Sequence, residues 1–93
     1  MSEEIPDEEL LIAAPHDPAA FEIFFRRRSE AVLAYFMRRT SDPEVAADLM
    51  AETFAAALLG ARRFRRRPEP ALSWLFTIAR NELADHARRG RVA

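Results

Sequence analysis

Apolar residues in this chain recur at intervals of three and four, and this spacing constrains the fold more than any other feature of the sequence. Residues three, four and seven apart share one face of an α-helix, whereas a half-buried strand alternates every second residue. No alternating β-branched run occurs, and only Gly60 and Gly90 are glycines. The 93 residues therefore predict an all-α fold, a single small bundle of three to four main helices.

The first main helix is predicted over residues 17–40. Aspartate is a favoured N-cap residue and proline fits the first helical position, so Asp17-Pro18 is a start signal. The arginines at 26–28, followed by Ser29, indicate a kink or a break within this long run. The apolar face comprises Phe21, Phe24, Phe25, Val32, Tyr35 and Phe36.

The second main helix is predicted over residues 42–60. It starts either with Asp42 as N-cap before Pro43 or with a capping box between Ser41 and Glu44. Gly60 is a suitable stop, because glycine readily adopts the left-handed conformation that ends many helices. The core face comprises Val45, Leu49, Met50, Thr53, Phe54, Ala57 and Leu58.

An arginine-rich loop over residues 61–69 leads to the last main helix, which is predicted over residues 70–89 with Pro70 as its first residue. Arg89, Gly90 and Arg91 are expected to fray. The apolar stripe comprises Leu72, Leu75, Phe76, Ala79 and Leu83, with Trp74 and Ile78 beside it. The polar face comprises Thr77, Arg80, Asn81, Asp85 and Arg88.

Charge is segregated between the two ends of the chain. Residues 1–25 carry seven acids and no base, and residues 60–93 carry nine arginines against three acids, a net charge of +6. The acidic N-terminal segment, residues 1–16, is expected to include a short helix from Asp7 to Ala14 that Pro15 ends. A polyanion is the expected partner of the basic end.

Several classes of function find no support in the sequence. There is no cysteine, and His16 and His86 lack neighbouring ligands, so no metal or other cofactor is expected. Because no nucleophile-base pair or phosphate loop is present, an enzyme resting on the two histidines is the weakest alternative. No apolar run reaches the roughly 18 residues of a membrane span, and the acidic start does not fit a secretory signal, which predicts a cytoplasmic location.

Arginine and aromatic residues are interleaved from the loop into the last helix. Arginines neutralise phosphates and rings stack on exposed bases, a combination typical of single-stranded nucleic-acid binding. Asn81 offers both a donor and an acceptor to a base edge. Trp74 is expected in the core rather than as a stacking platform, and for Phe64 both placements stay open.

The order of sequence blocks resembles region 2 of bacterial sigma factors, and within the sigma-70 family most of all the extracytoplasmic-function (ECF) group. The resemblance covers about residues 7–91. It is carried mainly by two blocks about twenty residues apart, AADLMAETF at residues 46–54 and WLFTIARN at residues 74–81. Together these blocks are specific, whereas either one alone is weak.

The resemblance implies that the chain is a transcription initiation factor domain with two partners and no catalysis. The helix over 42–60 is expected to bind the clamp helices of the largest subunit of core RNA polymerase. The residues that the resemblance assigns to this contact are Asp48, Leu49, Met50, Glu52 and Phe54. An anti-sigma factor is a further candidate partner, and the domain is expected to be a monomer.

The second implied partner is promoter DNA. The loop from Phe64 to Ala71 and the last helix are expected to recognise the −10 element and help melt it, by binding its non-template strand with a pocket for a flipped base. The predicted DNA-binding residues are Phe64, Arg65, Arg66, Arg67, Thr77, Arg80, Asn81, Arg88 and Arg89.

Three positions depart from the family pattern: Ala47 replaces a glutamate, Ala51 a frequent glutamine and Thr77 a frequently basic residue. Sigma factors normally continue into a helix-turn-helix region that reads the −35 element, so the sequence is expected to be a domain fragment or a stand-alone region 2. The alternative function is a protein-interaction module. In that case Val45–Leu59 forms the binding surface, for polymerase or an anti-sigma factor, and the arginines are merely solvated.

Overall fold

The computed structural model describes residues 5–66 and 68–92, and over these residues the protein is helical without a strand. This confirms the all-α prediction. The elements in chain order are α1 (Asp7–Ala13), α2 (Pro18–Thr40), α3 (Pro43–Gly60), the short 3₁₀ helix η2 (Ala61–Arg63) and α4 (Ala71–Val92).

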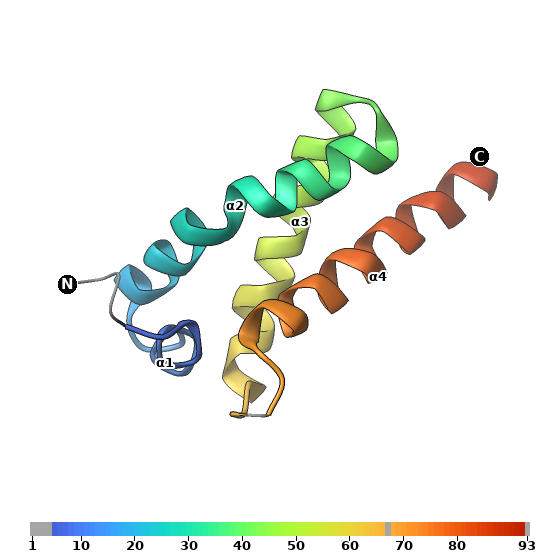
Figure 1. Ribbon diagram of the computed structural model, residues 1–93. Helices are drawn as coiled ribbons and strands as arrows, with labels where there is room; N and C mark the ends of the chain where they lie inside the picture. The colour runs from blue at the N-terminus through green and yellow to red at the C-terminus, as the bar shows by residue number, and fades with distance from the viewer. Residues whose placement is uncertain (1–4, 67, 93) are drawn as a thin grey trace.

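Helix α3 lies at the centre of the bundle, because it packs against both α2 and α4 (Figure 1). Helix α1 packs on the N-terminal half of α2 and also contacts η2 and α4. The molecule is elongated, with extents of 43 × 23 × 23 Å. Between Ala79 and Gly90 no further residue of α4 is buried, so the second half of this helix lies at the edge of the bundle.

Both Asp-Pro start signals are confirmed. The Asp17 carboxylate accepts a hydrogen bond from the Ala19 amide at 3.1 Å. The Asp42 carboxylate accepts hydrogen bonds from the amides of the second and third residues of α3, at 3.0 and 3.4 Å. Asp42 is therefore the N-cap of α3, and the alternative of a capping box between Ser41 and Glu44 is wrong. Ser41 is not the cap of α3; it ends α2 in the left-handed conformation, with φ of 56°.

Three predicted boundaries differ from the structure. The kink or break predicted at residues 26–28 is absent, and α2 is one continuous helix there. The side chains of Arg27 and Arg28 extend from it to Asp7 of the N-terminal segment. Gly60 is the last residue of α3 as predicted, but its φ of −74° is right-handed and the chain continues directly into η2. Helix α4 begins at Ala71, one residue after Pro70, and extends past Arg89 to Val92.

The core is built from all four helices and is rich in aromatic rings. Phe54 of α3 lies against three rings of α2, with the ring centroids of Phe25 and Phe54 only 4.9 Å apart. Tyr35 of α2 contacts Phe76 of α4, with centroids 5.3 Å apart. The largest fully buried side chains are Phe24, Phe36, Leu11, Leu49, Leu75, Val32 and Thr53.

Leu58 was placed on the core face by the sequence, and this prediction is wrong. Its side chain is 44% exposed. The buried positions Ala46, Leu49, Thr53 and Ala57 follow the three-and-four spacing of one face. Leu58 lies one turn after the buried Phe54, near the C-terminal end of α3, where it lines a surface hollow with Pro15, Pro18 and Phe21 instead of entering the core.

Candidate nucleic-acid interface

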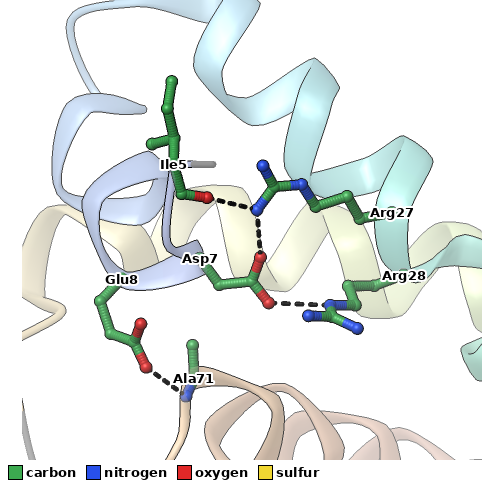
Figure 2. Close-up of polar contacts among 6 residues, drawn as sticks. All are labelled: Ile5, Asp7, Glu8, Arg27, Arg28 and Ala71. Atoms are coloured by element: carbon green, nitrogen blue, oxygen red, sulfur yellow. Dashed lines mark hydrogen bonds and ion pairs between the residues drawn. The ribbon is translucent and has the colours of Figure 1, made fainter. Parts of the chain in front are cut away.

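Asp7 of α1 forms ion pairs with two arginines of α2 (Figure 2). Its carboxylate, only 8% exposed, accepts hydrogen bonds from Arg27 at 3.0 Å and from Arg28 at 2.8 Å. Arg27 also donates to the Ile5 carbonyl at 2.6 Å. These charge-assisted bonds fix the N-terminal helix to α2 on one side of the bundle.

The next two acids of α1 contact the segment that the sequence assigned to DNA. Glu8 Oε2 accepts a hydrogen bond from the Ala71 amide, the first of α4, at 2.9 Å (Figure 2). Glu9 forms an exposed ion pair with Arg66 of the loop, with an N···O distance of 3.7 Å. The sequence analysis predicted a polyanion partner for the arginines, and it did not predict that acids of the same chain contact this segment.

The loop before α4 is anchored by Phe64, which is only 7% exposed. Its ring meets the Trp74 ring edge to face, with centroids 5.1 Å apart. Trp74 is half-buried and packs against the core, as the sequence predicted. For Phe64, the structure selects the core placement over an exposed stacking platform.

Two adjoining hollows lie along the start of α4. The first lies between the loop and the helix and is lined by Phe64, Glu69, Pro70, Ser73, Trp74 and Thr77. The second continues toward Arg80 and is lined by Pro70, Leu72, Ser73, Phe76, Thr77 and Arg80. Because Pro70, Ser73 and Thr77 line both, the two form one depression, which we call the α4 groove.

The polar face of α4 flanks this groove. Thr77, Arg80 and Asn81 are exposed, and the Thr77 hydroxyl donates to the Ser73 carbonyl at 3.0 Å. Arg80 approaches the Thr77 hydroxyl oxygen at 3.5 Å. The structure thus places these three predicted residues together on one solvent-facing surface.

The remaining predicted DNA-binding residues are spread more widely. Arg65 is exposed and donates to the Phe64 carbonyl at 3.1 Å, and Arg67 lies outside the described residues. Arg88 is exposed and forms an ion pair with Asp85 one turn earlier on α4. Arg89 is exposed near the same end of the helix. These two arginines lie two turns or more beyond the α4 groove.

The predicted polymerase-binding residues of α3 divide into two groups. Asp48 and Glu52 are exposed, and Met50 is half-buried. Leu49 and Phe54 are 2% and 4% exposed, so the expectation that they contact a partner directly does not fit the structure. Ala47 and Ala51 are exposed, so two of the departures from the family pattern lie on the solvent side of α3 with the acids.

Glu52 of α3 is a neighbour of Glu82 of α4, so the exposed acids of α3 lie close to the last helix. Partial burial raises the pKa of Glu82, and a hydrogen bond with Glu52 and the repulsion between the two carboxyl groups raise it further. Arg89 opposes this shift.

Features of other functional classes are missing from the described part of the chain. No group of three or more metal-ligating side chains comes together there. His16 is exposed in the turn between α1 and α2, whereas His86 lies on α4. Among the helices described, none combines the length and apolarity needed to cross a membrane.

Comparison with known proteins identifies the family. The model of sigma-70 region 2 matches residues 24–92. The ECF RNA polymerase sigma factor BldN of Streptomyces coelicolor is 36% identical over 77% of the chain, and RNA polymerase sigma factor YlaC of Bacillus subtilis is 36% identical over 75%. The ECF RNA polymerase sigma factor SigL of Mycobacterium tuberculosis is 30% identical over 85%.

The matched regions make up 27%, 40% and 45% of these three relatives, so the chain spans less than half the length of each. No solved structure matches the chain. The matches confirm the resemblance that rested on the paired blocks in α3 and α4. The chain therefore belongs to the sigma-70 region 2 family, and within it to the extracytoplasmic-function group.

Proposed function

We propose that this domain acts in transcription initiation by joining core RNA polymerase to the non-template strand of a promoter −10 element. The observation that carries the proposal is the α4 groove, which lies beside the exposed side chains of Thr77, Arg80 and Asn81. The names of the relatives, RNA polymerase sigma factors, supply the polymerase as the partner. In this role the arrangement binds and orients a strand.

The α4 groove has the chemistry to hold an unpaired base. Its walls combine the apolar surfaces of Pro70 and Trp74 with the hydroxyls of Ser73 and Thr77. Extruding a base costs a few kcal/mol, which stacking of about 1–3 kcal/mol per base can offset. Arg80 adds a cation beside the groove, so binding is expected to weaken as salt increases.

On α3, the proposed contact with the polymerase clamp helices is made by Asp48 and Glu52. Both are exposed, unlike Leu49 and Phe54, whose role is to hold α3 in the core. The partner surface should be basic, because Asp48 and Glu52 present two exposed negative charges on α3.

Substituting both Arg80 and Asn81 with alanine is expected to weaken binding of a single-stranded −10-like oligonucleotide by at least about tenfold, since base and phosphate contacts contribute about 1–3 kcal/mol each. Fluorescence anisotropy at low salt measures the affinity, and a salt titration should show a shallower slope for the variant. Arg26→Ala on α2, which removes the same charge from an exposed site, is the matched control. Equal affinity of the double variant and the wild type would contradict DNA binding by α4.

Reversing both acids of α3, as Asp48→Arg with Glu52→Arg, is expected to reduce retention on isolated polymerase clamp helices by at least about tenfold, because repulsion replaces attraction across the contact. The fold should tolerate the change, since both side chains are exposed and an arginine at position 52 would face Glu82. Glu22→Arg with Glu30→Arg on α2, two exposed acids whose reversal changes the net charge by the same amount, is the control for net charge. Unchanged retention of the double variant would exclude this face of α3.

A second candidate function is protein interaction without DNA contact. It is favoured by the burial of Phe64 and by the existing ion pairs of Arg66 and Arg88. The two experiments distinguish the candidates. A domain that needs Asp48 and Glu52 for polymerase but does not bind the oligonucleotide is an interaction module only, whereas binding that does not depend on Arg80 and Asn81 would move the DNA contact away from α4.

A further inference from the structure

Helix α4 begins at a place where its own sequence supplies no cap. The first amides of a helix lack intrahelical acceptors, and a side chain just before the helix usually provides one. Here the preceding residue is Pro70, whose ring has no acceptor atom. Ala71, the first helical residue, is only 2% exposed, so its amide is shielded from water and needs an acceptor within the protein.

Glu8 of α1 provides that acceptor from 63 residues earlier in the sequence. Its Oε2 accepts the hydrogen bond of the Ala71 amide at 2.9 Å, as Figure 2 shows. A negative charge is favourable at this end of the helix, because the unpaired amides carry partial positive charge. Glu8 therefore does the work of an N-cap residue for a helix to which it does not belong.

The residues on both sides of Glu8 hold α1 against the rest of the bundle. The preceding residue, Asp7, is held by the two arginines of α2 described above. Two and three residues further on, Leu10 and Leu11 are 3% and 0% exposed and fix α1 in the core. The carboxylate of Glu8 thus projects from a backbone that has contacts on both sides.

We propose that Glu8 is a positioning residue for strand binding: it fixes the first turn of α4 and, through that turn, the shape of the α4 groove. Pro70 and Ser73, which flank Ala71, line both hollows of the groove. Loss of the cap leaves the first turn free to fray and the two walls of the groove free to separate. The inference rests on the proposed function of the groove, and it assigns to the acidic N-terminal helix a role in DNA recognition.

Two substitutions of Glu8 separate its hydrogen bond from its charge. Glu8→Gln and Glu8→Ala both remove a negative charge near the groove, but only glutamine keeps an oxygen that can accept from Ala71. In hydrogen exchange measured by NMR, the Ala71 amide is expected to exchange about fivefold faster in Glu8→Ala than in Glu8→Gln, the equivalent of the ~1 kcal/mol typical of an N-cap. Thermal unfolding of both variants shows that the comparison is made on folded protein.

The same pair is then compared in binding to the single-stranded −10-like oligonucleotide. Glu8→Ala is expected to bind about two- to fivefold more weakly than Glu8→Gln, because only the fraction of molecules with an ordered first turn is competent to bind. Glu30→Ala on α2 removes the same charge from an exposed position elsewhere and should bind like the wild type.

Each outcome has one meaning. If the Ala71 amide exchanges at the same rate in the two variants, Glu8 is not the cap of α4, and this holds whatever the oligonucleotide affinities are. Faster exchange in Glu8→Ala with equal oligonucleotide affinity of the two variants overturns the positioning role. If both variants bind the oligonucleotide more tightly than the wild type by the same factor, Glu8 acts only as a charge that repels the strand. If the wild type does not bind the oligonucleotide at all, the proposed function fails and the positioning role fails with it, while the exchange data still decide the cap.

Discussion

Replacing Phe54 with alanine is expected to lower the free energy of unfolding by about 3–5 kcal/mol, the usual cost of removing a buried phenylalanine. The ring is 4% exposed and its centroid lies 4.9 to 6.4 Å from those of Phe21, Phe24 and Phe25. For a domain of 93 residues, a total stability of about 5–14 kcal/mol follows from roughly 0.05–0.15 kcal/mol per residue. The substitution therefore removes a large part of the stability.

Chemical denaturation measures the free energy of unfolding. Retention on the polymerase clamp helices, measured at a temperature at which the variant is still folded, measures binding. Phe54→Leu should restore most of the stability, because it refills most of the volume. Leu59→Ala, at the 73% exposed last leucine of the same helix, is the control and should change stability by less than about 0.5 kcal/mol. A Phe54→Ala domain that is fully stable but fails to bind polymerase would show that the ring makes the contact itself.

The second large effect is expected for Asp7→Ala, which should lower the free energy of unfolding by roughly 2–4 kcal/mol. Breaking a fully buried ion pair typically costs 3–5 kcal/mol, and the value here is lower because Arg27 and Arg28 remain 20% and 35% exposed. The variant leaves Arg27 without its carboxylate, and one nitrogen of that guanidinium is already buried without a hydrogen-bond partner among the described residues. Helix α1 should detach first, since Asp7 forms its ion pairs with α2 and leaves only the apolar contacts of Leu10 and Leu11 when it is removed.

Glu22→Ala is the matched control for Asp7. Its ion pair with Arg26 is also short, 2.5 Å, but the two side chains are 57% and 76% exposed. An exposed pair of this kind contributes at most a few tenths of a kcal/mol, about 0.3–0.5 on a helix. Similar losses for Asp7→Ala and Glu22→Ala in denaturant unfolding would show that Asp7 has no special role.

Much of the fold could be predicted because its signals are local. The caps of α2 and α3 depend on Asp17 and Asp42, each of which acts on amides two or three residues away. The three-and-four spacing of apolar residues placed Phe24, Leu49 and Leu75 in the core correctly. Local chemistry of this kind is present in the sequence whatever the tertiary arrangement becomes.

The candidate interface was predicted in part. Thr77, Arg80 and Asn81 do share an exposed face, because one helix carries all three and helical spacing determines their relative positions. The placement of Phe64 could not be decided, since a loop residue has no periodicity and its burial depends on Trp74 meeting it from α4. For Leu49 and Phe54 the family motif named the residues, but a motif does not distinguish a side chain that contacts a partner from one that supports the contact.

The helical class, the starts of α2 and α3 and the family were determined by the sequence alone, because each depends on spacing or on a motif within one segment. The partners of Asp7, Glu8 and Glu9 were decided only by the tertiary structure. Consecutive residues on a helix point about 100° apart, so three adjacent acids face three different neighbours. Which neighbours those are follows from how α1 packs on the bundle, and that packing places an acidic side chain at the start of the helix proposed to bind DNA.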